Sequence, residues 1–331
     1  MKELIRKLCE VYGPVGREDA VRELIRQEIE DVVDEVRVDA LGNLIAVKRP
    51  TQDGAQPGKR IMLAAHMDEI GVMVSHVDEK GFLRVTPVGG VLAAAVLGTQ
   101  AMFEDGTRGV FGIEGQILVR DKPDLGKVYL DVGASSKEEQ RLGIGDQAVF
   151  RTEFVDQGKR LLAPNMDNRI SCAVLVQVLH EIKQTPNEIV AVFTVQEEVG
   201  LRGAGTAAFG VEPDVVIALD VTAAGDLPEV KVSPAALGAG PAIKVKDTRM
   251  LAHLGARRWL ARWPKPTRSP TSWKCWNLAP PTPPPPRSAA GVRRRASIPS
   301  LRPSASQMVD YDDVQNCVRL LVNGLSEVVE V

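Results

Sequence analysis

The sequence lacks several features that would place the protein in a specialised class. No run approaches the roughly eighteen apolar residues that a membrane-spanning helix needs. The first residues, MKELIRKLCEVYG, lack the apolar core of a signal peptide, so we expect a cytoplasmic protein that does not bind membranes. Cysteine is scarce, and the chain has no C-x-x-C pair, so we expect reduced, mostly buried thiols at Cys9, Cys172, Cys275 and Cys317.

Acidic residues are missing from one long stretch. Between Thr248 and Val309 there is no Asp or Glu, but there are twelve Lys or Arg. The net charge of the whole chain is −2, and without those twelve positive charges it would be −14. The rest of the chain is therefore acidic and offers no basic surface for nucleic acid.

The distribution of apolar residues predicts an α/β protein of one large or two modest domains. A wholly apolar strand is expected at 61–65 and further apolar strands at 189–198 and 215–220, with helices at 170–182 and 309–329. From residue 71 to about 154 the pattern changes to short alternating β segments and turns, which predicts an inserted β-barrel or sandwich. We therefore expect a central mixed sheet flanked by helices in 1–69 and 163–331, and a small β domain in 70–162.

Polar residues with metal-binding chemistry follow the three apolar strands. His66 and Asp68 come after the first strand, Glu197 and Glu198 end the second, and Asp220 ends the third. The carboxyl ends of parallel strands meet at one edge of a sheet, where ligands bind. A further carboxylate, Asp167 in the loop before the next helix, could join them.

One imidazole and several carboxylates at the same edge would repel one another unless cations neutralise them. Mixed nitrogen and oxygen ligands suit Zn²⁺, Co²⁺ or Mn²⁺, and two such ions about 3.5–4 Å apart form a hydrolytic pair. Asp68 could accept the second N–H of His66 and fix its tautomer. Because neighbours on a strand point apart, one of Glu197 and Glu198 could bind metal while the other takes a proton from water.

Each of these residues also has an ordinary structural explanation. A single His after a strand is more often structural, two adjacent Glu usually face solvent, and an Asp at a strand end often caps a helix. The joint pattern is what favours a metal site. His76 and His180 are expected to be ordinary surface or packing residues, and His253 is left unassigned.

Four ordered motifs resemble a known family. They are 65-AHMDEIGVMV-74, 163-APNMDNRISCAVL-175, 194-TVQEEVGLRGA-204 and 217-IALDVT-222. They are similar to motifs of the cocatalytic metallo-aminopeptidases of peptidase family 42, which include glutamyl aminopeptidases, tetrahedral aminopeptidases and relatives labelled endoglucanases. The resemblance covers about residues 1–253 and 308–329.

The resemblance implies a fold, a reaction and a role for each site residue. The fold is a peptidase domain with an inserted β-barrel, assembled into dodecamers, and the reaction removes N-terminal residues from peptides with two divalent ions, zinc or cobalt. The implied roles are metal ligation by His66 and Asp220 at one ion, a bridge by Asp167, ligation by Glu198 at the other ion, general-base action by Glu197, and orientation of His66 by Asp68.

The stretch 254–306 departs from the family pattern. A Gly-Thr-Asp-Ala element and a His-Ser-Pro element, whose His ligates the second metal, are both absent, and 302-RPSASQ-307 stands in place of the latter. The proline run at 280–286 cannot supply backbone donors to a helix or a central strand. We interpret 254–306 as a frame-shifted stretch, and the alternative is a genuine proline-rich, basic insert. If the stretch is real, impaired activity is expected.

Other functions remain open on the sequence. A two-metal N-acyl amino acid deacylase or carboxypeptidase could use a similar centre. An endoglucanase would need a pair of carboxylic acids acting without metal. A degraded, non-catalytic homologue could use its basic, proline-rich stretch as a binding scaffold.

Overall fold

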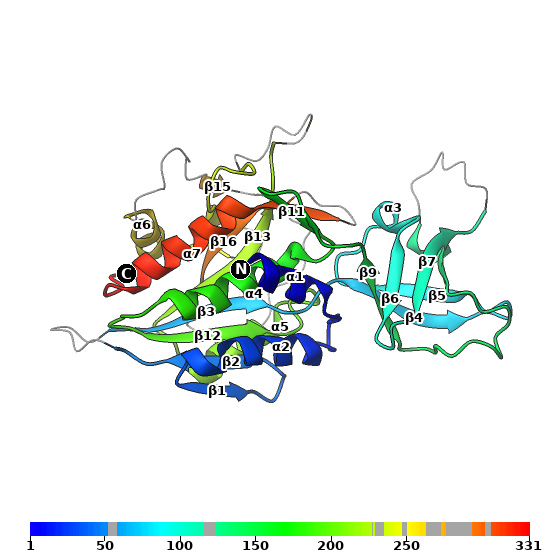
Figure 1. Ribbon diagram of the computed structural model, residues 1–331, viewed down its shortest axis with the longest axis horizontal. Coiled ribbons are helices and arrows are strands. Elements are labelled where there is room, and N and C mark those ends of the chain that lie inside the picture. Colours follow the sequence, from blue (N-terminus) through cyan, green and yellow to red (C-terminus); the bar gives the residue numbers. More distant parts are fainter. Residues whose placement is uncertain are drawn as a thin grey trace.

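The computed structural model describes residues 1–51, 58–115, 124–226, 228, 235–246, 250–262 and 306–331, and the backbone of 273–275 and 293–301. Figure 1 shows two parts, a sheet covered by helices and a separate barrel at one end of it. The described helices are α1 (Lys2–Glu10), α2 (Asp19–Ile29), α3 (Ala93–Val96), α4 (Met166–Glu181), α5 (Arg202–Val211), α6 (Leu254–Arg262) and α7 (Tyr311–Leu325).

The main sheet is mixed and has six strands. Their order is β1 (Glu35–Val38), β2 (Leu44–Lys48), β12 (Glu188–Thr194), β3 (Arg60–His66), β13 (Val215–Ala223) and β16 (Arg293–Leu301). Strand β2 pairs antiparallel with β1 on one side and with β12 on the other. Strands β12, β3, β13 and β16 run parallel to one another. Strands β12, β3 and β13 are apolar, as expected for strands that are buried on both faces.

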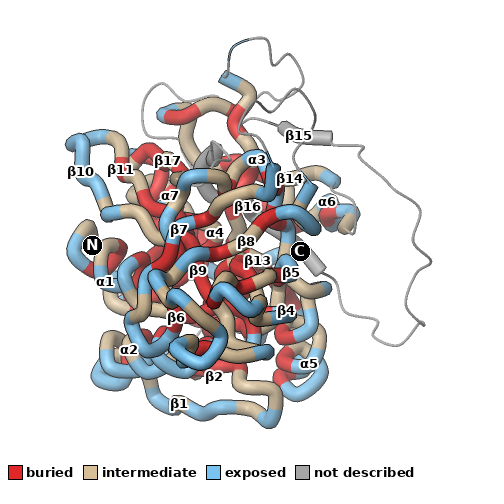
Figure 2. Tube along the Cα trace, turned by 90° about the vertical axis from the view of Figure 1, so that its right-hand side faces the viewer, coloured by how far each residue is buried: buried red, intermediate tan, exposed pale blue. Residues whose placement is uncertain are grey.

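Alternate residues of each strand pack against different helices. On one face Leu63 and Phe193 join the large core formed with α1, α2, α4 and α7. On the other face Met62 and Val192 pack against Ala207 and Val211 of α5. Buried residues are concentrated along α4 and the strands beside it (Figure 2). Successive residues of a strand point to opposite faces of the sheet. A strand that is covered by helices on both faces is therefore apolar at successive positions.

The second part is a closed barrel whose strands lie between β3 and α4 in the chain. Its strands follow the order β4 (Gly71–Val77), β5 (Leu83–Val88), β8 (Val128–Asp131), β7 (Arg108–Ile113), β6 (Gln100–Phe103) and β9 (Gln147–Arg151). Phe103, Phe111 and Phe150 lie in its apolar interior. The prediction of an α/β protein with an inserted barrel is therefore confirmed, and the alternative of a sandwich is wrong because the strands close on themselves.

Two smaller sheets complete the described structure. One contains β10 (Val155–Asp156), β11 (Arg160–Ala163) and β17 (Gln307–Asp310), and the other pairs β14 (Ile243–Lys246) with β15 (Trp273–Cys275). Two short 3₁₀ helices occupy Glu30–Val32 and Leu125–Lys127. Within the part of the chain that the structure describes, no helix combines the length and the apolar character needed to cross a bilayer.

Part of the unusual stretch 254–306 has regular structure. Helix α6 begins it, with Trp259 and Leu260 buried in the large core. Strand β16 lies beside β13 at the edge of the main sheet. Both segments lie outside the proline run, which is the part of the stretch expected to supply no backbone donors to a helix or a central strand. The proline run at 280–286 and most of the remaining stretch lie outside the described residues.

Candidate metal centre

Three neighbouring strands bring the predicted residues to one edge of the sheet. Strand β12 pairs in parallel with β3 so that Thr194 lies opposite His66. Strand β13 pairs with the other side of β3 so that Ala218 lies opposite Ala64. Extending that register by two residues brings Asp220 level with His66. Strand β13 continues to Ala223, so the prediction that Asp220 ends its strand is wrong, although its level in the sheet is as expected.

Glu197 and Glu198 lie in a turn and not on a strand. Strand β12 ends at Thr194, and Gln196 then adopts a left-handed conformation with φ 55°. The expectation that strand geometry separates the two side chains is therefore wrong. The turn is held by Asp68, whose Oδ1 and Oδ2 accept hydrogen bonds from the backbone N–H groups of Glu197 and Glu198, both at 3.0 Å.

Asp167 lies at the start of α4, where the helix is irregular. Asp167 and Asn168 both have non-helical φ and ψ angles inside the assigned helix. The backbone N–H of Asp167 donates to Oε1 of Gln307 at 2.8 Å, and the Asn168 side chain donates to the carbonyl of Leu219 at 2.9 Å. These bonds tie the Asp167 turn to β17 on one side and to β13, next to Asp220, on the other.

The four predicted acidic residues of the site lie around the imidazole of His66. Nε2 of His66 is 3.2 Å from Oδ1 of Asp167, 3.9 Å from Oδ1 of Asp220 and 4.0 Å from Oε2 of Glu197. One donor atom from each of His66, Asp167 and Glu198 lies within 4.8 Å of the others. The sequence-based prediction that these residues meet at one edge is consistent with this geometry.

The imidazole is oriented by Asp68, but mainly through its backbone. Nδ1 of His66 lies 3.0 Å from the Asp68 carbonyl oxygen and 3.6 Å from its carboxylate Oδ1. A carbonyl oxygen accepts only, so Nδ1 carries a proton, and Nε2, which faces the carboxylates, is the atom that could bind a cation. The Asp68 carboxylate lies farther from Nδ1 than the carbonyl does and also accepts from the turn at 197–198, so its role in orienting His66 stays a prediction.

The electrostatics of the cluster show an excess of negative charge. Burial raises the pKa of Glu198 to about 8, and the neighbouring carboxylates of Asp167, Glu197 and Asp68 add to this, although His66 opposes it. Burial by itself lowers the pKa of His66, but its contacts with Asp167, Asp68 and Glu197 outweigh burial and raise it. A single imidazole faces four carboxylates, so the site is short of positive charge.

The donor set fits divalent cations. A buried imidazole nitrogen and several carboxylate oxygens within a few ångströms are the ligands that Zn²⁺, Co²⁺ and Mn²⁺ prefer. The cations would also remove the repulsion that otherwise favours a proton on Glu198.

The other three histidines of the chain lie elsewhere. His76 is exposed on the barrel strand β4, His253 is exposed before α6, and Nε2 of His180 lies 2.7 Å from the carbonyl oxygen of Glu28. The expectations for His76 and His180 are consistent with these positions. A second cation at this centre would therefore have only oxygen ligands among the described residues around His66.

Some residues next to the centre were not anticipated from the sequence. Gly89, in the loop after barrel strand β5, packs against the turn, and a Cβ atom there would lie 3.2 Å from Cβ of Glu198. Gln307 contacts the Asp167 backbone, as described above. Glu69 and Arg169 form a buried ion pair beside the centre at 2.8 Å. Glu69 and Arg169 both carried a signal, since they lie in quoted motifs close to Asp68 and Asp167.

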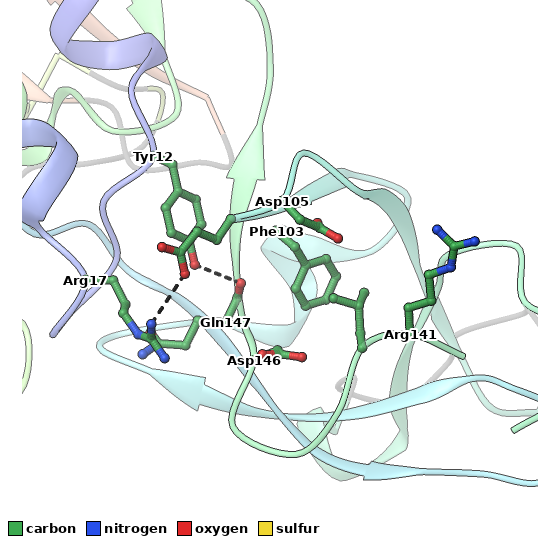
Figure 3. A pocket seen from close by; sticks show the side chains of 9 residues that line it. Tyr12, Arg17, Phe103, Asp105, Arg141, Asp146 and Gln147 are labelled. Atoms are coloured by element: carbon green, nitrogen blue, oxygen red, sulfur yellow. Dashed lines mark hydrogen bonds and ion pairs between the residues drawn. The ribbon is translucent and has the colours of Figure 1, made fainter. Parts of the chain in front are cut away.

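A separate cavity of about 350 Å³ lies between the N-terminal segment and the barrel (Figure 3). Tyr12 and Arg17 line one side of it, and Phe103, Arg141 and Gln147 belong to the barrel side. None of the predicted metal or base residues lines this cavity. The metal centre is therefore a different site.

Comparisons with known proteins show which family the chain is similar to. The sequence profile of the M42 glutamyl aminopeptidase family matches residues 42–276. A putative aminopeptidase of Acetivibrio thermocellus is 42% identical over 330 residues, which cover 98% of each chain. The structure is similar to an aminopeptidase of the archaeon Desulfurococcus kamchatkensis, with a TM-score of 0.85, 34% identity and coverage of 98% of this chain and 94% of the other.

A second similar structure is the TET1 peptidase of Pyrococcus horikoshii, which can assemble into a tetrahedron or a large octahedral shell. Its TM-score is 0.80 at 25% identity, with 98% of this chain and 99% of the other covered. The family profile spans well over half of the sequence, and the Acetivibrio relative spans nearly all of it. The chain therefore belongs to the M42 glutamyl aminopeptidase family and is an aminopeptidase.

Proposed function

We propose that this aminopeptidase uses two divalent cations, zinc or cobalt, to release N-terminal residues from peptides. The observation that supports the proposal most directly is the convergence of His66, Asp167 and Glu198, whose donor atoms lie within 4.8 Å of one another. Asp220, with Oδ1 3.9 Å from Nε2 of His66, completes the proposed ligand set. His66 and Asp220 would hold one ion, Glu198 the other, and Asp167 would bridge them.

The bound cations would supply Lewis-acid chemistry, polarising the scissile carbonyl, anchoring the free amine and making water acidic. The protein residues would supply the rest. Glu197, whose Oε2 lies 4.0 Å from Nε2 of His66, would accept a proton from the attacking water and pass it to the departing amine. Asp68 would keep Glu197 and Glu198 at the centre through their backbone N–H groups.

The stretch 254–306 bears on the level of activity. With that stretch as it stands, no histidine follows His253, so the second cation has no imidazole. We expect such a chain to bind the second cation weakly and to be impaired as a peptidase. The competing proposal of a frame-shifted stretch is tested by intact-mass measurement and peptide mapping. Natural protein that contains the peptide WPKPTR would rule out a sequencing error.

We further propose a homo-oligomer in the cytoplasm that takes peptides and neither nucleic acid nor membranes as partners. The assembly is supported by the likeness to the TET1 peptidase, which itself forms large shells. The dodecamer remains the expected form.

The proposed function is tested by comparing peptides that differ only at their N-terminus. Purified protein with added Zn²⁺ or Co²⁺ is assayed on a peptide with a free amine and on the same peptide N-acetylated, each with and without a chelator. We expect hydrolysis of the free peptide alone, and loss of that activity with the chelator. Preferential hydrolysis of the acetylated peptide would instead support a deacylase or carboxypeptidase, and no hydrolysis of either would support a non-catalytic scaffold.

A further inference from the structure

A buried ion pair lies directly beside the proposed metal ligands. Glu69 follows Asp68 in the chain, and its Oε1 accepts a hydrogen bond from Nη2 of Arg169 at 2.8 Å. Its other oxygen, Oε2, accepts from the side-chain amide of Asn165 at 2.9 Å. Glu69, Arg169 and Asn165 are 2%, 0% and 2% exposed, so both oxygens of one carboxylate are used away from solvent.

The two partners of Glu69 lie on either side of a proposed ligand. Asn165 is two residues before Asp167, and Arg169 is two residues after it. The backbone between them is not helical at Asp167 or at Asn168, and one long backbone hydrogen bond, from the N–H of Arg169 to the carbonyl of Asn165 at 3.3 Å, spans this turn. The side-chain hydrogen bonds of Asn165 and Arg169 to Glu69 therefore add to this backbone bond in placing Asp167.

The same network holds the N-terminal segment, residues 8–15. Arg169 donates to the carbonyl oxygens of Leu8, Val11 and Gly13 at 2.5, 3.1 and 3.2 Å. The backbone N–H of Glu69 also donates to the Gly13 carbonyl, at 3.2 Å. Gly13 lies so close to the pair that a Cβ atom there would stand 2.7 Å from Nη2 of Arg169.

On its other side this segment contacts the barrel. The hydroxyl of Tyr12 donates to the carbonyl of Gln147 at 3.0 Å (Figure 3), and the Gln147 side chain donates to the carbonyl of Val15 at 3.1 Å. The segment is thus held between the barrel and the Glu69 network. It provides a fixed support behind the Asp167 turn.

Burial of an ion pair is a poor source of stability, because desolvation offsets most of the attraction. The network fixes Asn165 and Arg169, which flank the proposed ligand Asp167, so its main effect is on the position of that ligand. We propose that Glu69 is a positioning residue of the metal centre, which acts by tying Asn165 and Arg169, and with them Asp167, to the Asp68 turn. This inference rests on the proposed function, since it concerns the same cations.

The test variant is Glu69→Gln, which keeps the shape of the side chain but removes its charge. Metal-free protein is titrated with Zn²⁺ by calorimetry, and kcat and KM are measured on a free-amine peptide. We expect the Zn²⁺ dissociation constant to rise about 10–100-fold, as is typical when a group that orients a ligand is lost. We also expect kcat to fall more than KM changes.

A matched control separates positioning from a loss of stability. Asp313 is 1% exposed, and its carboxylate accepts two backbone hydrogen bonds, from Gly238 and Gly240, each at 2.7 Å. Its described contacts involve none of the proposed ligands. The variant Asp313→Asn should lower the melting temperature but leave the Zn²⁺ dissociation constant and kcat unchanged. All titrations are made at a temperature where circular dichroism shows each variant to be folded.

A folded Glu69→Gln protein with a Zn²⁺ dissociation constant and kcat within twofold of the parent would overturn the inference. If Glu69→Gln does not fold, Asn165→Ala is used in its place, because it removes a neutral group and leaves the ion pair intact. For this variant we expect a rise of about tenfold, at the lower end of the same range, and no rise would again overturn the inference. A parent protein that binds no Zn²⁺ would count against the proposed function instead.

Discussion

The carboxylate of Asp68 accepts hydrogen bonds from the backbone of Glu198 and of its neighbour Glu197, each at 3.0 Å. This carboxylate is fully buried, and burial alone would raise its pKa. The nearby His66 and the two N–H donors outweigh burial and lower the pKa instead, so Asp68 stays ionised. A buried, ionised acid therefore fixes the turn that carries the proposed base and one proposed ligand.

The variant Asp68→Asn should weaken metal binding. The amide oxygen of Asn can replace one carboxylate oxygen, but its NH₂ group would face the other backbone N–H, donor against donor. We expect metal affinity and kcat to fall about 10–100-fold. Calorimetric titration with Zn²⁺ and steady-state kinetics measure both quantities, and parental values for both would show that the turn does not need Asp68.

Glu197→Gln and Glu198→Gln form a matched pair of neighbouring variants. If Glu197 transfers the proton, Glu197→Gln should lower kcat by about 10²–10⁴-fold while metal content stays the same. Glu198→Gln should instead lower the metal content, because it removes a charged ligand. Elemental analysis of dialysed protein, alongside kinetics, distinguishes the two, and the reverse assignment would follow if Glu197→Gln were the variant that loses metal.

The centre should bind its two cations unequally. Among the described residues around it, only His66 offers an imidazole nitrogen, so one ion has nitrogen and oxygen ligands and the other has oxygen alone. Oxygen ligands suit Zn²⁺ less well than a mixed set does. A calorimetric titration of metal-free protein with Zn²⁺ should show one tight step and one weaker step, and two equally tight steps would contradict this asymmetry.

Cys9 and Cys317 should be unreactive in the folded protein. Burial raises the pKa of each thiol to about 12, so almost no thiolate is present at pH 8. After brief treatment with iodoacetamide at pH 8, peptide mapping should find both thiols unmodified. Both should be modified once the protein is unfolded in guanidinium, and rapid modification in the folded state would show that these helices open easily.

Much of the fold could be predicted because apolar residues recur at regular spacing. The run 61–65 became the central strand β3, and Val314, Cys317, Val318, Leu321 and Leu325 are all buried on α7 as their spacing indicates. Strand β17 was missed because its partner β11 is distant in the chain, so no local pattern marks the pairing. The edge strand β16 was missed because its arginine-rich sequence has none of the apolar character of the other parallel strands.

The residues of the candidate site could be predicted, but not how each is held. The parallel register of β13 with β3 places His66 and Asp220 at one level, as the two apolar runs indicate, although β13 continues past Asp220. The positions of Glu197 and Glu198 depend instead on a left-handed residue, Gln196, and on a hydrogen-bonded turn, neither of which has a strong sequence signal. The Glu69–Arg169 pair was missed because two charged residues far apart in sequence usually face solvent.

The central claim is that His66, Asp167, Glu198 and Asp220 hold the cations of this aminopeptidase. The most direct measurement is anomalous diffraction at the zinc edge from crystals grown with Zn²⁺. We predict a strong peak about 2.0–2.2 Å from Nε2 of His66 and from carboxylate oxygens of this set, with a second, weaker peak beside Glu198. Zinc peaks that lie only elsewhere in the molecule, with these four side chains free of metal, would contradict the account.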